Sequence, residues 1–319
     1  MAGWFWPGAW TLDLAVLGLA VLLDALLPEP PNAMHPVVWM GKLTAAFDRR
    51  APHDQRRRAL LAGAGIAVLL PVLFAAAAGW AGWGLREWSA AAYVIGGAVL
   101  LKSTFAVRGL AQAALGVARP LAEGRVDAAR EGLPSLVGRD PAVLSESLVA
   151  AAAVESVAEN ASDSFAAPWL AFAILGLPGA FAYRAVNTLD SMIGYRGRYE
   201  YLGKASARLD DAINWLPSRV TAMLVLAAGA LVGLSPRRGW KTLRRDHAST
   251  ASPNAGWPMS AMAGLLGVAL EKPGHYRLGA AFRDPAAGDI RRAVRVCYGV
   301  AALALPLAGG VVAARHALL

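Results

Sequence analysis

The sequence predicts an all-α fold: a polytopic helical integral membrane protein with re-entrant or buried helices and cytoplasmic helical loops. Of its 319 residues, 56% are hydrophobic and only 17% are charged, and the mean hydropathy is +0.43. Soluble domains of this length carry more charge and fewer apolar residues. Glycine is abundant, with 33 residues, as expected where transmembrane helices pack closely.

The net charge of +9 does not indicate nucleic-acid binding, because the basic residues cluster beside apolar runs. That arrangement is typical of cytoplasmic loops that face anionic lipid. We therefore expect the lipid bilayer, and no nucleic acid, among the partners. The single cysteine, Cys297, excludes an intramolecular disulfide and a cysteine-based zinc site.

The apolar runs, taken in chain order, predict four membrane spans at about residues 4–27, 59–85, 88–107 and 296–314. Two aspartates interrupt the first span. Asp24 lies near its inner end and is expected to reach water, whereas Asp13 lies deeper and is expected to face other helices. The third span ends near Lys102, whose long side chain is expected to extend toward the inner surface.

Between the first two spans lies a loop with four prolines, which forbid regular helix there. His35 lies in this loop, and its position alone leaves both a structural role and contact with substrate open. The loop continues into Arg49–Arg58, where five arginines in ten residues mark the cytoplasmic side.

Residues 108–147 are polar and predict a cytoplasmic helical region of two or three helices, with breaks at Pro120, at residues 132–134 and at residues 140–141. The charged turn Gly138-Arg139-Asp140 closes this region. It is open to two interpretations, a surface loop or an arginine that binds phosphate or carboxylate.

Three further apolar runs, at residues 165–183, 220–236 and 258–270, lie beside basic loops. We expect them to be re-entrant or buried in the bundle rather than to cross the membrane. For the first of them a hairpin is expected at Gly176-Leu177-Pro178-Gly179, a strong helix-breaking sequence. The whole chain, residues 1–319, is interpreted as a single membrane-embedded catalytic domain.

An acidic cluster precedes the first of these runs, in the sequence AVESVAENASDS. Glu155, Glu159 and Asp163 are spaced i, i+4, i+8, so a helix places their carboxylates on one face. Like charges on one face repel unless a cation or basic groups lie among them. The element Asn-x-x-Asp-Ser at residues 160–164 recurs at residues 187–191. A solvated helix face is the alternative, but the repeat and the adjacent apolar run favour a functional site.

The chain contains no Walker A loop, no G-x-S-x-G, no H-E-x-x-H and no C-x-x-C motif. What remains is a set of carboxylates and amides without a cysteine or a histidine pair, which suits Mg²⁺. Arginines among them suit phosphate or carboxylate oxygens. These residues indicate a membrane-embedded, Mg²⁺-dependent enzyme that acts on an anionic, phosphate-bearing substrate.

Along almost its whole length the chain resembles the adenosylcobinamide-phosphate synthase family (CobD/CbiB type) of cobalamin biosynthesis. The resemblance rests on the acidic cluster, on the charged turn at residues 138–140, and on the following elements: His35-Pro36-Val37 with Gly41, Tyr183-Arg184-x-x-Asn187-Thr188-Leu189-Asp190-Ser191-Met192-x-Gly194, Asp210-Asp211-x-x-Asn214-x-x-Pro217-x-Arg219 and Ser252-Pro253-Asn254-Ala255-Gly256-Trp257-Pro258. One departure is Met259, where the family pattern leads us to expect a glutamate.

The resemblance implies a multi-pass protein of the bacterial inner membrane with its active site on the cytoplasmic side. It implies a ligase that joins the propionate carboxylate of adenosylcobyric acid to the amine of (R)-1-amino-2-propanol phosphate. ATP is the expected co-substrate, through an acyl phosphate, and Mg²⁺ the expected cofactor. A second copy of the chain, or other late corrinoid-pathway enzymes, are the expected protein partners.

The resemblance also implies roles for particular residues. Asp163 and Asp190 are expected to bind the metal ion. The residues expected to be catalytic are Glu155 or Glu159 as the base, with Asn160 and Arg184. Those expected to bind substrate are His35, Arg139, Asp140, Asn187, Tyr195, Arg196, Asp211 and Asn254.

Two other classes remain open. A membrane transferase for diphosphate or lipid substrates also uses acidic motifs beside Mg²⁺, although it usually shows D-x-x-x-D or N-D-x-x-D, which this chain lacks. A transporter places carboxylates at broken helices between well-defined spans, an arrangement that the basic loops here argue against. A signalling membrane protein without enzymatic activity is a third, less favoured alternative.

Overall fold

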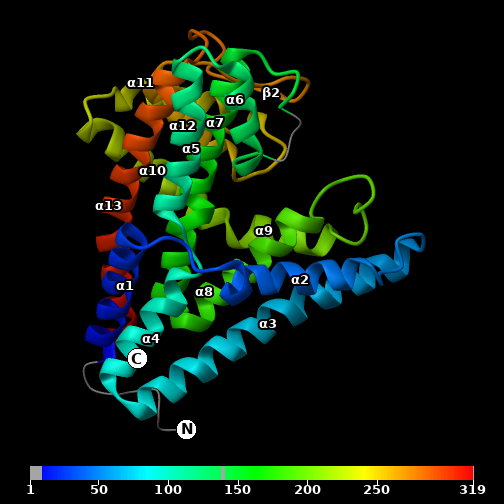
Figure 1. The fold of residues 1–319 in the computed structure, drawn as a ribbon, viewed down its shortest axis with the longest axis vertical. Coiled ribbons are helices and arrows are strands. Elements are labelled where there is room, and N and C mark those ends of the chain that lie inside the picture. The colour runs from blue at the N-terminus through cyan, green and yellow to red at the C-terminus, as the bar shows by residue number, and fades with distance from the viewer. Residues whose placement is uncertain (1–8, 138–140, 319) are drawn as a thin grey trace. The chain divides into compact units, whose positions relative to one another are not determined.

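The computed structural model describes residues 9–137 and 141–318 and is helical along most of that length (Figure 1). The predicted all-α fold class is therefore confirmed. Within the described residues, four helical stretches are long and apolar enough to cross a membrane: Arg56–Trp88, Ala90–Ala122, Glu146–Ile193 and Ala287–Leu318. The chain divides into two compact units, one formed by residues 1–106, 167–213 and 306–319 and the other by residues 107–166 and 214–305.

The first unit contains eight helical elements within the described residues. They are α1 (Ala9–Leu26), η1 (Asn32–Met34), α2 (Pro36–Asp48), α3 (Arg56–Trp88), α4 (Ala90–Lys102), α8 (Ala167–Ile193), α9 (Lys204–Ile213) and the part of α13 (Ala287–Leu318) from Pro306 onward. Helix α3 packs against α8, α4 and α9, and α1 packs against α4 (Figure 1). Close packing needs small residues, because a Cβ atom on Gly63 of α3 would overlap the carbonyl oxygen of Leu202.

Helix α8 is broken where the sequence predicts a break. Gly176 has φ 68° and ψ −157°, outside the helical region and in one that favours glycine. A Cβ atom on Gly179 would overlap the carbonyl oxygen of Ala171 and would lie 2.6 Å from the Cβ atom of Leu175. Residues eight apart lie about 12 Å apart along a straight helix, so the chain reverses direction at Gly176. The break expected at residues 176–179 is therefore present, and the re-entrant course of residues 165–183 in the membrane stays a prediction.

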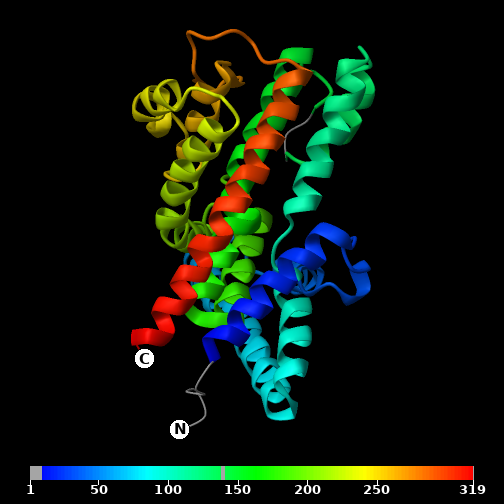
Figure 2. The same ribbon diagram turned by 90° about the vertical axis from the view of Figure 1, so that its left-hand side faces the viewer.

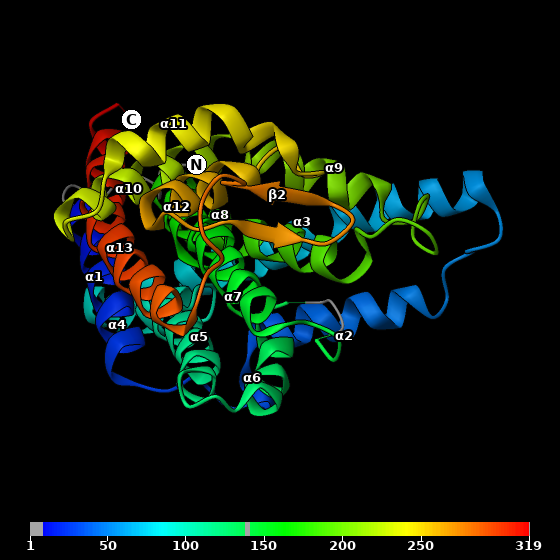
Figure 3. The ribbon, with the colours of Figure 1, turned by 90° about the horizontal axis from the view of Figure 1, so that it is seen from above.

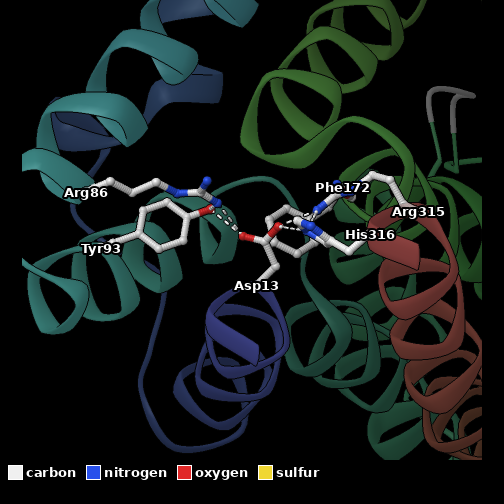
Figure 4. Close-up of polar contacts among 6 residues, drawn as sticks. All are labelled: Asp13, Arg86, Tyr93, Phe172, Arg315 and His316. Carbon is white, nitrogen blue, oxygen red and sulfur yellow. Dashed lines mark hydrogen bonds and ion pairs between the residues drawn. The ribbon is translucent and has the colours of Figure 1, made fainter. Parts of the chain in front are cut away.

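A buried polar group ties the helices of the first unit together (Figure 4). Asp13 of α1 is only 1% exposed. Its carboxylate accepts hydrogen bonds from Arg86 of α3 at 2.7 Å and from Tyr93 of α4 at 2.6 Å. It also pairs with Arg315, and its Oδ2 atom lies 3.1 Å from Nε2 of His316, both on α13. The expectation that Asp13 faces other helices is confirmed.

The second unit contains α5 (Val107–Ala122), α6 (Val126–Gly132), η2 (Leu133–Ser135), α7 (Glu146–Ala161), the π-helix η3 (Ser162–Ala166), α10 (Trp215–Leu231), α11 (Pro236–Asp246), η4 (His247–Ser249), α12 (Gly256–Leu266) and the first part of α13. Helix α12 lies at its centre, since every residue from Pro258 to Leu266 is buried. Helices α10 and α11 pack on α12, as the yellow and orange ribbons of Figure 2 show.

Three details of this unit differ from, or refine, the sequence prediction. Pro120 does not break α5, which continues to Ala122, because a proline near the end of a helix removes only one of its last hydrogen bonds. Helix α12 has 11 residues, too few to cross a membrane, so the run at residues 258–270 is buried. A two-stranded antiparallel hairpin, β1 (Leu270–Lys272) and β2 (Tyr276–Leu278), follows it (Figure 3).

Candidate functional site

The acidic cluster lies in the second unit, on α7 and η3. Ser145 caps α7 by accepting a hydrogen bond from the backbone N–H of Leu148. Glu155 is only 4% exposed, and Glu159 and Asp163 are half-buried. Glu155 therefore does not lie on a solvated helix face. A π-helix follows α7, a rare element that frequently occurs at functional sites, and it changes the regular helical spacing at Asp163.

Amide and hydroxyl groups hold the cluster in place. Ser156 Oγ donates to the carbonyl oxygen of Leu136 at 2.8 Å, and Asn160 Nδ2 donates to the carbonyl oxygen of Ser156 at 3.0 Å. Ser164 Oγ donates to Asn160 Oδ1 at 3.4 Å. Asn160 therefore acts at least in part as a positioning residue within the first Asn-x-x-Asp-Ser element.

The second Asn-x-x-Asp-Ser element ends α8 in the first unit. Arg184 Nη1 donates to Asn187 Oδ1 at 3.1 Å, so these two predicted site residues are brought together. Thr188 Oγ1 donates to the carbonyl oxygen of Arg184 at 2.7 Å. A Cβ atom on Gly194 would overlap Oδ1 of Asp190, which gives a physical reason for glycine four residues after this aspartate.

Asp190 is half-buried. The carboxylate of Asp211, on α9, lies close enough for the two negative charges to repel each other. Within the part of the chain that the structure describes, the Asp190 side chain makes no hydrogen bond and no ion pair. Burial raises the pKa of the Asp211 carboxyl above its usual value, although the Arg208 cation partly opposes that shift. Asp190 thus lies next to a second carboxylate and has no basic partner among the described residues, and a cation bound at this pair stays a prediction.

These oxygen donors fit Mg²⁺, which prefers carboxylate oxygens and takes its other ligands from water and substrate phosphates. Asp163 belongs to the second unit and Asp190 to the first, so their expected sharing of one metal ion stays a prediction. Among residues 9–137 and 141–318, no three His, Cys, Asp or Glu side chains are grouped in a way that could hold a metal ion.

His35 caps α2, because its Nδ1 atom accepts from the backbone N–H of Val37 at 3.2 Å. Its Nε2 atom lies 3.5 Å from Glu29, which pairs with Lys102 at 2.5 Å. Burial favours a higher pKa for Glu29, but His35 and Lys102 together bring it below its usual value. These contacts account for His35 structurally, and its contact with substrate stays a prediction.

Two expectations about charged residues near this loop are wrong. Lys102 is 6% exposed and lies 3.2 Å from Asp24, which is also buried. The Lys102 side chain is therefore enclosed by the protein, and Asp24 does not reach water. The two opposite charges compensate each other inside the unit, which lowers the cost of burying either one.

Asn254 lies in a polar and aromatic group of the second unit. Its Oδ1 atom accepts from Ser218 Oγ at 3.3 Å and from Arg219 Nη1 at 3.0 Å. The Arg219 guanidinium lies over the rings of Trp215 and Trp257, at 4.5 and 4.7 Å from their centroids. Gly256 permits this arrangement, since a Cβ atom there would overlap the carbonyl oxygen of His247; the His247 ring in turn packs on the Trp257 ring.

No role was predicted from the sequence for Arg219, Trp215 or Trp257. One signal was present in the sequence: Trp215 and Arg219 are four residues apart, the spacing that brings side chains together on a helix. Their approach to Trp257 depends on the packing of α10 against α12, which local sequence does not reveal.

The remaining predicted residues are less informative. Tyr195 and Arg196 follow α8 and are exposed. Arg139 and Asp140 lie outside the described residues, as do the first residues of the predicted span 4–27. Met259, where the resemblance leads us to expect a glutamate, is 2% exposed and accepts a hydrogen bond from Tyr276 Oη to its sulfur at 3.9 Å. A thioether suits that apolar position better than a carboxylate does.

Comparisons with known proteins agree with one another. A family model described as CobD/Cbib protein matches residues 17–297. "Cobalamin biosynthesis protein CobD" of Dehalococcoides mccartyi is 43% identical over 270 residues, which cover 83% of this chain and 86% of that protein. The protein of the same name from Klebsiella pneumoniae is 37% identical over 317 residues, 92% and 95% of the two chains. "Cobalamin biosynthesis protein CbiB" of Salmonella arizonae is 36% identical over 316 residues, 91% and 94%. No solved structure matches.

Proposed function

The chain belongs to the CobD/Cbib family, and from this premise we propose that it is the adenosylcobinamide-phosphate synthase of cobalamin biosynthesis. It forms an amide between the propionate carboxylate of adenosylcobyric acid and the amine of (R)-1-amino-2-propanol phosphate, with hydrolysis of ATP. The observation that supports this chemistry best is the Asp190–Asp211 pair, because phosphoryl transfer requires a cation-binding carboxylate site.

In the proposed reaction a carboxylate oxygen of adenosylcobyric acid attacks the γ-phosphorus of ATP, and ADP leaves. The resulting acyl phosphate is attacked at its carbonyl carbon by the substrate amine. The amine gives up a proton, inorganic phosphate leaves, and the amide remains. Bound Mg²⁺ would supply charge stabilisation for the phosphate oxygens.

The protein groups divide these tasks among them. We assign the cation to Asp190 and Asp211, while the role of Asp163 as a metal ligand is kept as a separate prediction from the sequence. Glu155 or Glu159 accepts the proton of the amine, as a carboxylate in a largely buried environment is suited to do.

Arginine and amide groups bind and orient the anionic substrates. Arg184, oriented by Asn187, binds phosphate or carboxylate oxygens, for which its planar guanidinium offers two parallel donors. Asn254, held in place by its contacts with Ser218 and Arg219, binds substrate in the second unit.

The chain is a membrane protein with several helices able to span a bilayer. We place it in the inner membrane with the active site facing the cytoplasm, where ATP is found. The basic loop Arg49–Arg58 favours that orientation. Labelling of single cysteines introduced into this loop tests it: the orientation requires protection from a membrane-impermeant reagent in intact cells.

The test of function is an assay of the purified chain in lipid nanodiscs with adenosylcobyric acid, aminopropanol phosphate, ATP and Mg²⁺. Adenosylcobinamide phosphate, ADP and inorganic phosphate are expected in equal amounts. If AMP and pyrophosphate form instead of ADP and inorganic phosphate, the activated intermediate is an acyl adenylate and not an acyl phosphate. Absence of the amide, with turnover of a prenyl diphosphate instead, would overturn the proposal in favour of a membrane transferase.

A further inference from the structure

Arg219 carries a positive charge that no acidic side chain compensates in the part of the chain that the structure describes. Among the described residues no carboxylate forms an ion pair with it, and its contacts are to neutral groups and to aromatic rings. Other arginines of the same unit, such as Arg245 with Asp246 and Arg283 with Asp289, are paired with carboxylates. Holding an unpaired cation in a half-buried position costs free energy unless a bound anion compensates the charge.

The guanidinium is also held in a fixed orientation. Its Nη1 atom donates to the carbonyl oxygen of Trp215 at 2.6 Å, to Ser218 Oγ at 3.2 Å and to Asn254 Oδ1 at 3.0 Å. Nη2 donates to the carbonyl oxygen of Pro253, at a long distance of 3.5 Å. The protein thus accepts the hydrogen bonds of Nη1. The edge of the guanidinium formed by Nε and Nη2 is left to donate to a ligand with two oxygens.

The two indole rings strengthen this preorganisation. A guanidinium within 6 Å of a ring centroid is attracted to the ring face, and both rings meet that condition. Trp257 is itself packed against His247, which is fixed by a 3.0 Å contact between its Nδ1 atom and the carbonyl oxygen of Leu243. Trp215, in contrast, is 57% exposed, so a planar or apolar group of a ligand can pack on it.

We infer that Arg219 binds a phosphate group of one of the two phosphate-bearing substrates, ATP or aminopropanol phosphate. This inference rests on the proposed function and adds a binding residue in the second unit. A multiply charged phosphate gains more from an uncompensated guanidinium than a single carboxylate does. An exposed indole beside it would suit the purine of ATP, so the two sources are separated by experiment.

The alternative is an interfacial role. Trp215 and Leu216 are both exposed at the start of α10, and tryptophan beside arginine is common where a helix meets the lipid headgroups. In that case Arg219 would hold the protein in the membrane and would contact no substrate. The two roles differ in the kinetic constant that a substitution changes.

The test compares Arg219→Lys with wild type in nanodiscs of fixed lipid composition, with KM measured separately for ATP, aminopropanol phosphate and adenosylcobyric acid. Lysine keeps the charge but lacks the planar pair of donors. Loss of one hydrogen bond between charged groups corresponds to about a 10- to 100-fold change, so we expect KM for one phosphate-bearing substrate to rise by that factor. KM for adenosylcobyric acid is expected to change less than about twofold.

The matched control is Arg237→Lys, an exposed arginine of α11 in the same unit, which is expected to leave all three constants unchanged. If Arg219→Lys is not recovered as folded protein, Arg219→Gln serves in its place. The inference is overturned if neither phosphate-bearing substrate shows a raised KM, or if all three constants rise equally. Absence of amide synthesis in wild type would instead count against the proposed function.

Discussion

Two acidic positions of the first unit differ in the positive charge that surrounds them. Asp13 lies among Arg86, Arg315 and His316, with the Tyr93 hydroxyl as a further donor (Figure 4). Asp190 lies beside another carboxylate, that of Asp211. Among the described residues no basic side chain pairs with Asp190.

We propose that this difference separates a structural carboxylate, Asp13, from a functional one, Asp190. Burying a charge without a partner costs several kcal/mol, and the partners of Asp13 remove that cost while joining α1, α3, α4 and α13. Nothing in the described protein does the same for Asp190. We propose that a cation, bound together with substrate, compensates its charge.

The largest effect is expected from Asp190→Asn, and Asp211→Asn is expected to act in the same way. Each should reduce amide synthesis by more than about 100-fold. Substitution of residues that only hydrogen-bond to metal ligands already lowers metal affinity or activity by about 10- to 100-fold. Thermal unfolding in detergent should show no loss of stability, since each change removes a like-charge repulsion. A stability loss parallel to the activity loss would assign this pair to the fold instead.

Asp13→Asn is expected to have the opposite profile. Removing one partner of a buried ionic group costs about 3–5 kcal/mol, so the unfolding free energy should fall by that amount. The folded fraction should retain near wild-type kcat. Asp127→Asn, at an exposed position, is the control and should change neither quantity. A selective loss of kcat in Asp13→Asn without destabilisation would contradict the structural role.

The double variant Asp163→Asn/Asp190→Asn tests whether the two repeated elements serve one centre. Groups that act as a unit are not additive, so the double variant should be little worse than either single variant. Both single variants should also require more Mg²⁺. Multiplied losses would mean that Asp163 and Asp190 act independently.

A smaller effect is expected from pH. Because burial raises the pKa of Asp211, this carboxyl takes up a proton at a higher pH than an ordinary aspartate does. Mg²⁺ affinity should therefore be lost, as pH falls, at a higher pH than for an unperturbed carboxylate. Arg208 lowers that pKa, so Arg208→Gln should move the transition to still higher pH, whereas Arg208→Lys should leave it in place. Equal transitions in both variants would exclude Asp211 as the titrating group.

Features set by local chemistry could be predicted from the sequence. The break in α8 follows from Gly176 and the proline two residues later. Among the described residues, the helical stretches Arg56–Trp88, Ala90–Ala122 and Ala287–Leu318 overlap spans expected from composition, whereas Glu146–Ile193 contains a run that was expected not to cross. Asp13 was expected to face other helices because a lone charge in a span is costly. The hairpin β1–β2 was missed, since strands of three residues are too short to show an alternating pattern.

Features that depend on distant partners could not be predicted. Lys102 was expected at the membrane surface, but its partners Asp24 and Glu29 lie on a segment 73 to 78 residues away in sequence. The relation of Asp190 to Asp211 depends on how α9 packs against α8. The contact of Arg219 with Trp257 likewise joins α10 to α12.

The account depends most directly on a cation at Asp190 and Asp211, and calorimetric titration of the purified chain with Mn²⁺, a probe that replaces Mg²⁺, tests it. The titration is carried out with a non-hydrolysable ATP analogue present. We expect saturable binding to wild type and to Asp13→Asn, and binding weakened at least about tenfold in both Asp190→Asn and Asp211→Asn. Unchanged Mn²⁺ affinity in these last two variants would contradict the account.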